Sequence, residues 1–96
     1  MHQRRVTIVS KVGLHARPAG LLATNAAAQP LPVTIAKVTD GTPGRPVDAA
    51  SVLELMTLGA EHGDEVELAA EGDGAETVLD ELVELLTRDL DGEPTT

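Results

Sequence analysis

The chain has 96 residues, none of them cysteine or aromatic, and a formal net charge of −9 at pH 7. This length allows one small domain, whose core must be built from Leu, Val, Ile, Ala and Met side chains. The composition excludes disulfides and thiolate metal sites and fits a reducing compartment, so we expect a cytoplasmic protein. No apolar run approaches the length that crosses a bilayer, and no signal peptide is recognisable.

The charges are unevenly distributed along the chain. Residues 1–48 sum to +4, whereas residues 49–96 sum to −13. The acidic half argues against a nucleic-acid partner, because nucleic-acid binding needs basic surface to displace counterions. The mildly basic first half suits an anionic group held there and acidic partner surfaces approaching it. The three histidines lie far apart in sequence, so we expect no metal site.

The first predicted elements are a strand and a helix. An alternating run over residues 5–9 predicts the strand, and residues 10–14 form a loop that leads to His15. A helix follows over about residues 16–28, in which four residues keep helical spacing on one face: Ala19, Leu22, Ala23 and Ala26. Pro18 falls in its first turn, where a missing N–H is tolerated. We therefore expect His15 at or just before a helix N-terminus, with its ring free of the core.

This position of His15 has chemical consequences. The first N–H groups of a helix lack intrahelical partners, and the macrodipole places partial positive charge there, which favours an anion. That charge disfavours the imidazolium cation and leaves a neutral ring nitrogen as a nucleophile. The backbone N–H groups of Ala16 and Arg17, with the Arg17 guanidinium, are placed to bond the oxygens of a phosphoryl group on His15. On spacing alone, the alternative is a solvated surface histidine.

The middle of the chain predicts two strands and a short helix. Val33–Val38 is a second alternating run, and residues 39–46 are dense in turn residues. A short strand over Arg45–Asp48 is expected to pair back in a hairpin. A helix over Ser51–Leu58 follows, with Asp48 or Ser51 as its N-cap and Gly59 as a left-handed C-cap.

The last part of the chain predicts one more strand and one more helix. The strand covers Glu65–Ala70, with Val66, Leu68 and Ala70 facing the core, and with Glu65 and Glu67 solvated on its outer face. The helix covers about residues 75–90. Its apolar stripe is Val78, Leu79, Leu82, Val83, Leu86 and Leu90, and its water-facing residues include Asp80, Glu81 and Glu84.

The order of elements is therefore β-α-β-β-α-β-α. This order is typical of an α+β domain with helices packed on one face of a sheet. We expect a single domain over residues 1–90 and a frayed C-terminal tail over residues 91–96.

Three motifs carry a resemblance to a known family. Residues 13–19, Gly-Leu-His-Ala-Arg-Pro-Ala, resemble the active-site motif of the HPr family, the histidine-containing phosphocarriers of the bacterial phosphotransferase system. Residues 50–59 resemble the family's motif around a regulatory serine, and residues 63–72 resemble its last strand and turn. The resemblance runs from about Val6 to Leu86 and implies an open-faced β-sandwich, with a four-stranded antiparallel sheet and three helices on one face. The turn over residues 39–46 is longer than is usual in the family.

The resemblance also implies a function and partners. His15 would accept a phosphoryl group from phosphorylated enzyme I and pass it to sugar-specific enzyme IIA proteins, with Arg17 beside the phosphate. The protein would be a monomeric carrier without a cofactor rather than a stand-alone catalyst. Its partner surface would combine the first and second helices as an exposed apolar rim: Gly20, Leu21, Thr24, Val52 and Leu55. The alternative is that Leu21, Val52 and Leu55 belong to the core.

Ser51 gives rise to a second functional hypothesis. It aligns with the serine that a dedicated kinase phosphorylates in many Gram-positive relatives, which implies a serine kinase and phosphatase as further partners. The alternative is a plain N-cap serine, since Asp48 and Glu54 lie close in sequence and oppose added negative charge. Glu54 stands where relatives often have a small or basic residue. A regulatory module acting through Ser51, or a carrier for a nitrogen-related or dihydroxyacetone-kinase branch, are the competing functions.

Overall fold

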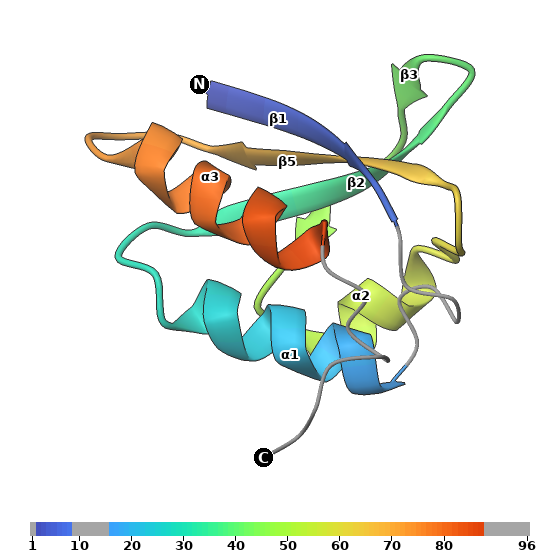
Figure 1. Ribbon diagram of the computed structural model, residues 1–96, viewed down its shortest axis with the longest axis horizontal. Helices are drawn as coiled ribbons and strands as arrows, with labels where there is room; N and C mark the ends of the chain where they lie inside the picture. The colour runs from blue at the N-terminus through green and yellow to red at the C-terminus, as the bar shows by residue number, and fades with distance from the viewer. Residues whose placement is uncertain (1, 9–15, 88–96) are drawn as a thin grey trace.

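The computed structural model describes residues 2–8 and 16–87, and these residues form a sheet with three helices on one of its faces (Figure 1). The elements in chain order are β1 (His2–Thr7), α1 (Ala16–Ala27), β2 (Val33–Thr39), β3 (Thr42–Pro43), β4 (Val47–Asp48), α2 (Val52–Thr57), β5 (Glu65–Ala70) and α3 (Ala75–Leu86). This is the predicted α+β open-faced sandwich. The first strand extends from His2 rather than Arg5. The last helix ends at Leu86 rather than Leu90, and Leu90 lies outside the described residues.

The sheet is antiparallel, with the strand order β1-β5-β2-β3 and with β4 also paired to β2. The third predicted strand, at the edge of the sheet, is present but interrupted. Its first part places Pro43 opposite Val38, and its second part places Val47 opposite Ile35. The chain leaves the ladder between these two parts, where Pro43 and Pro46 have no N–H group to donate. The edge of the sheet is therefore two short strands rather than the single strand expected over Arg45–Asp48.

The core lies between the sheet and the helices. The predicted inward residues of β5, Val66, Leu68 and Ala70, are all buried, as are Val33 and Ile35 on β2. The predicted faces of the two long helices are confirmed, with these residues buried: Ala19, Leu22, Ala23 and Ala26 on α1, and Val78, Leu79, Leu82 and Leu86 on α3. Period-2 strands and period-3.6 helices with matching apolar faces produce this two-layer packing.

The outer face of the sheet is less open than predicted. Glu67 points away from the helices, but its side chain is only 12% exposed, because Arg5 Nε donates a 3.0 Å hydrogen bond to its Oε2. Ala36 lies opposite Glu67 in the register and is also buried. The expectation of a solvated Glu67 is therefore wrong. The alternation correctly predicted its face, but neighbouring strands cover the side chain.

The turn before β5 is hydrogen-bonded to Ile8, the residue after β1. The Glu61 N–H donates to Asp64 Oδ2 at 2.9 Å, and the Asp64 N–H donates to the Glu61 carbonyl at 2.9 Å. Ile8 bonds this turn at both of its backbone groups, donating to the Asp64 carbonyl and accepting from the Gly63 N–H. The Glu61 N–H bond, assisted by Lys37 Nζ at 3.4 Å, lowers the pKa of Asp64 below its ordinary value of 3.8.

The lowered pKa of Asp64 predicts a pH-dependent contribution to stability. Because the folded-state pKa lies below the unfolded value, the stabilisation is present above the unfolded pKa and is lost as pH falls through the folded pKa. Asp64→Asn should therefore lower the free energy of unfolding at pH 7. The difference in unfolding free energy between this variant and the unmodified chain should shrink below about pH 4. Urea denaturation at pH 7 and pH 3 measures this. Asp73→Asn, at an exposed turn residue, is the matched control, and equal pH profiles for the two variants would contradict the prediction.

Candidate functional site

The candidate site lies at the start of α1. His15 itself lies outside the described residues, and α1 begins at the next residue, Ala16, as the sequence predicted. Pro18 in the first turn is buried, and Ala19 is 0% exposed, so these two residues anchor the start of the helix in the core. Arg17 lies between His15 and Pro18 in the chain and is exposed. The helix therefore presents Arg17 to solvent two residues after His15.

The electrostatics at this helix start favour an anion. The first turn of α1 contains no acidic residue, whereas α2 has Glu54 and α3 has Glu76 in the first turn. Arg17 makes no ion pair with any residue of the described ranges. The positive end of the α1 dipole and the Arg17 guanidinium are thus not neutralised by that part of the chain. A phosphoryl group at this position would meet both.

One exposed stripe of α1 runs away from this start. Arg17, Gly20, Leu21 and Thr24 are spaced as neighbours on a helix surface, and none of them is buried. The Thr24 hydroxyl donates to the Gly20 carbonyl at 2.9 Å, so its polar group is satisfied within the helix. A Cβ added at Gly20 would meet nothing within 4 Å. The glycine is therefore not required by packing inside the protein, and it leaves the stripe flat.

Helix α2, which packs against α1, also exposes apolar side chains. Val52 is 37% exposed, Met56 is 46% exposed and Leu53 is 80% exposed. We call these three residues together with Leu21, which is 37% exposed, the apolar patch. Such a cluster on a small protein is typical of a protein-binding surface.

The predicted partner surface needs one correction. Leu55 is 0% exposed and belongs to the core, so the expectation that it contributes to an exposed rim is wrong. Leu53 and Met56 were missed by the sequence analysis. The signal was present, since α2 has only six residues and four of them are apolar, too many for its single buried face.

Ser51 is the N-cap of α2. Its Oγ accepts from the Glu54 N–H at 3.3 Å, and its backbone N–H donates to the Asp48 carbonyl at 3.1 Å. The Glu54 carboxylate reaches back and accepts from the Asp48 N–H at 3.3 Å, while Asp48 Oδ1 accepts from the Ala50 N–H at 2.9 Å. A phosphate on Ser51 would therefore replace a capping bond and stand beside two carboxylates.

Two further properties of the described residues bear on the class of site. Among residues 2–8 and 16–87, no three His, Cys, Asp or Glu side chains are grouped so as to hold a metal ion. In the same part of the chain, no helix has both the length and the apolar character needed to cross a membrane.

Comparison with known proteins identifies the family of this chain. A family model described as "PTS HPr component phosphorylation site" matches residues 2–88. The phosphocarrier protein HPr of Streptomyces coelicolor is 44% identical over 96 residues, which are 100% of this chain and 99% of that protein. HPr of Haloferax volcanii is 39% identical over 85 residues, 88% of this chain and 92% of that protein.

The fold agrees with these sequence matches. A crystal structure of HPr from Thermoanaerobacter tengcongensis has a TM-score of 0.81 to this chain at 33% identity. The match covers 98% of this chain and 100% of that chain. Family model, relatives and fold all agree over nearly the whole length. The chain therefore belongs to the HPr family of phosphocarrier proteins of the phosphotransferase system.

Proposed function

We propose that this chain accepts a phosphoryl group on His15 from phosphorylated enzyme I and passes it to enzyme IIA proteins in the cytoplasm. The observation that carries the proposal is the start of α1, where Arg17 is exposed and where neither Arg17 nor the helix dipole is neutralised by any described residue. In each transfer, the bond from phosphorus to the donor breaks as the bond to the acceptor nitrogen forms. The carrier only holds the group and presents it, so no further catalytic base is needed.

Two features would stabilise the phosphorylated form. The free backbone N–H groups of the first turn and the positive end of the α1 dipole favour the added negative charge. Arg17 is exposed and near His15 in sequence, so its guanidinium would donate charge-assisted hydrogen bonds to the phosphoryl oxygens. The stabilisation must remain moderate, because a carrier has to release the group to the next protein.

The apolar patch of Leu21, Val52, Leu53 and Met56 would be the docking surface for both partners. These exposed apolar side chains would be buried against a partner when it binds, and the removal of their surface from water would favour the complex. The flat surface at Gly20 would allow close approach along α1. One surface shared by donor and acceptor suits a carrier that must dissociate from the first partner before it meets the second.

The environment of Ser51 favours a capping role over the competing regulatory function. Its hydroxyl already accepts the Glu54 N–H bond, and the carboxylates of Asp48 and Glu54 stand nearby. A carrier acting through His15 needs Ser51 only to begin α2 and so to hold the α2 part of the apolar patch in place.

The central prediction concerns His15 and Arg17. Incubation with phosphoenolpyruvate and enzyme I should add one acid-labile phosphate at His15, read by intact mass and site mapping, and His15→Ala should abolish it. Arg17→Ala should slow transfer about 10- to 100-fold, the equivalent of one charge-assisted hydrogen bond, without loss of the fold. Arg17→Lys keeps the charge but not the forked geometry of the guanidinium, so its transfer rate should fall between those of the unmodified chain and Arg17→Ala. Enzyme IIA proteins of the sugar and nitrogen-related branches are then compared as acceptors. If no phosphate appeared on His15 with enzyme I, while a serine kinase and ATP modified Ser51, the regulatory module would be supported instead.

The second prediction separates capping from modification at Ser51. Ser51→Ala removes the acceptor for the Glu54 N–H and should lower the free energy of unfolding by about 0.5–2 kcal/mol. Ser51→Asn keeps an N-cap acceptor and should be nearly neutral. Thermal denaturation measures both, and phosphorylation of His15 by enzyme I should be retained in both variants. Equal stability of the alanine and asparagine variants would contradict the capping role.

The third prediction uses the open space at Gly20. Gly20→Ala should raise the free energy of unfolding by about 0.5–1 kcal/mol, because alanine is the better helix former and its Cβ meets no neighbour. The same methyl group should slow phosphotransfer, since it stands on the docking stripe. Thr77→Ala on the exposed face of α3 is the control for a helix-favouring change elsewhere, and its transfer rate should be unchanged. Normal transfer by Gly20→Ala would show that partners do not approach this part of α1.

A further inference from the structure

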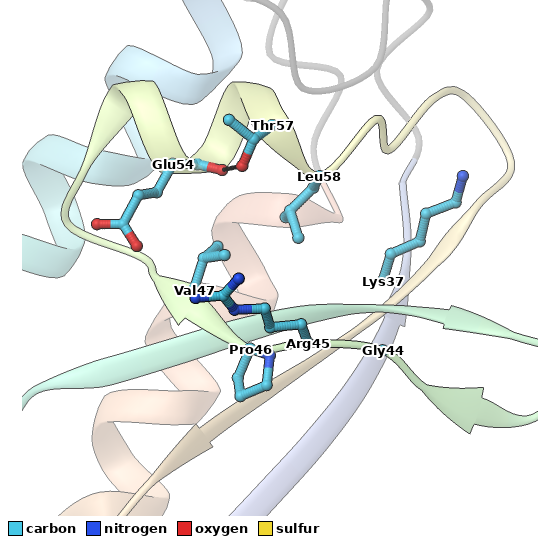
Figure 2. Close-up of a pocket in the computed structure, with 8 residues that line it drawn as sticks. All are labelled: Lys37, Gly44, Arg45, Pro46, Val47, Glu54, Thr57 and Leu58. Atoms are coloured by element: carbon cyan, nitrogen blue, oxygen red, sulfur yellow. Dashed lines mark hydrogen bonds between the residues drawn. The ribbon is translucent and has the colours of Figure 1, made fainter.

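A cleft of about 510 Å³ lies between α2 and the interrupted edge of the sheet (Figure 2). Thr57 and Leu58 line it from the helix side, and the segment from Gly44 to Val47 lines it from the sheet side. Its lining is mixed, with apolar Val47 and Leu58 next to charged residues. It lies on the flank of α2 that carries Glu54 and Thr57, whereas Leu53 and Met56 of the apolar patch project from the same helix to solvent.

The sheet-side wall of the cleft is held in place. It runs from Gly44, directly after β3, to Val47 at the start of β4, and the Gly44 N–H donates to the Lys37 carbonyl at 2.8 Å. A Cβ on Gly44 would come within 3.3 Å of that carbonyl oxygen, so the segment lies close against β2. Pro46 further restricts the backbone. The wall is thus formed before any partner arrives.

The charged side chains that line the cleft differ in whether they already have a partner within the protein. Lys37 Nζ is committed, because it lies 3.4 Å from Asp64 Oδ2 and donates to the Gly59 carbonyl at 3.3 Å. The Glu54 carboxylate accepts from the Asp48 N–H and points away from Thr57 in Figure 2. Arg45 is exposed and has no ion pair or hydrogen bond with any residue of the described ranges. Arg45 is therefore the available cation of the cleft.

The distribution of cations on the neighbouring helices gives Arg45 its significance. Helix α2 contains no Lys or Arg, and α1 contains Arg17 alone. In a chain with a net charge of −9, an acidic partner would be repelled unless a local cation offsets the field. Arg45 supplies one in the cleft, whose other wall is formed by residues of α2 and its C-cap. The apolar side chains of Val47 and Leu58 in the lining would exclude water from part of an ion pair formed there.

We propose that this cleft accepts an acidic side chain of enzyme I and that Arg45 recognises it, so that the docking surface extends from the two helices onto the edge of the sheet. The inference rests on the proposed carrier function. Glu54, on the opposite wall, would oppose the same contact. Removing the charge of Arg45 should weaken docking, and removing the charge of Glu54 should strengthen it.

The experiment measures the rate of phosphorylation by enzyme I against carrier concentration for the unmodified chain, Arg45→Gln, Glu54→Gln and Arg4→Gln. Arg4→Gln is the matched control, because it changes the net charge equally and lies on β1 in a pair with Asp80. We expect Arg45→Gln to raise KM about two- to fivefold with unchanged kcat, Glu54→Gln to lower KM, and Arg4→Gln to leave it unchanged. The Arg45 effect should shrink in high salt. Circular dichroism and thermal melting confirm that each variant is folded.

The outcomes separate this inference from the proposed function. If the unmodified chain takes no phosphate from enzyme I, the carrier function fails, and the docking inference fails with it. If the chain is phosphorylated but Arg45→Gln and Arg4→Gln have equal KM values, only the docking inference is overturned. A titration with inorganic phosphate, followed by the amide signals of Gly44 and Thr57, tests the other occupant. Saturable shifts below millimolar phosphate would assign the cleft to a small anion and would also overturn the inference.

Discussion

The central position of β5 is the constraint on which the rest of the structure depends. This last strand of the chain pairs with β1 on one side and β2 on the other, so that Val66 lies opposite both Val6 and Lys37. Its inner face is fully buried against the helices. The turn before β5 also bonds Ile8, the residue after β1, through both of its backbone groups, so residues 2–8 and 61–70 are joined along their length. The sheet under the helices therefore depends on pairing between distant parts of the chain.

The helices divide between stability and binding. Helices α1 and α3 bury complete apolar faces, whereas α2 buries only Leu55 and exposes most of its other apolar side chains. A helix of six residues has too few internal hydrogen bonds to be stable alone, so α2 depends on Leu55 and on its cap at Ser51. Its exposed side chains then remain available for partners. The core has no aromatic residues, so the apolar faces of α1 and α3 supply most of the helical side chains that cover the sheet. The exposed side chains of α2 leave the proposed docking surface apolar.

Charge is distributed according to the same division. Acidic side chains cover α3 and occur in the first turns of both α2 and α3. In the first turn of α1 the only charged residue is Arg17. The cations of β1 are paired with Asp80 and Glu67, and Lys37 is paired with Asp64. Two arginines have no ion pair with the described residues: Arg17 lies in the first turn of α1, and Arg45 lines the cleft beside α2. Within the described residues, these two arginines are therefore the ones available to an anionic group or an acidic partner.

Local patterns in the sequence determined the order of elements, the start of α1 at Ala16 and the strand Glu65–Ala70, because each depends on periodicity and turn chemistry within a few residues. The motif around His15, a residue outside the described ranges, likewise indicated the family from the sequence alone. The tertiary structure decided which side chains are covered. Leu55 is buried while Leu53 is exposed, Glu67 is covered by Arg5, and the edge strand is broken before Val47. Periodicity predicts which face a residue occupies, but burial and pairing depend on neighbours from distant parts of the chain, and only the folded arrangement brings those neighbours together.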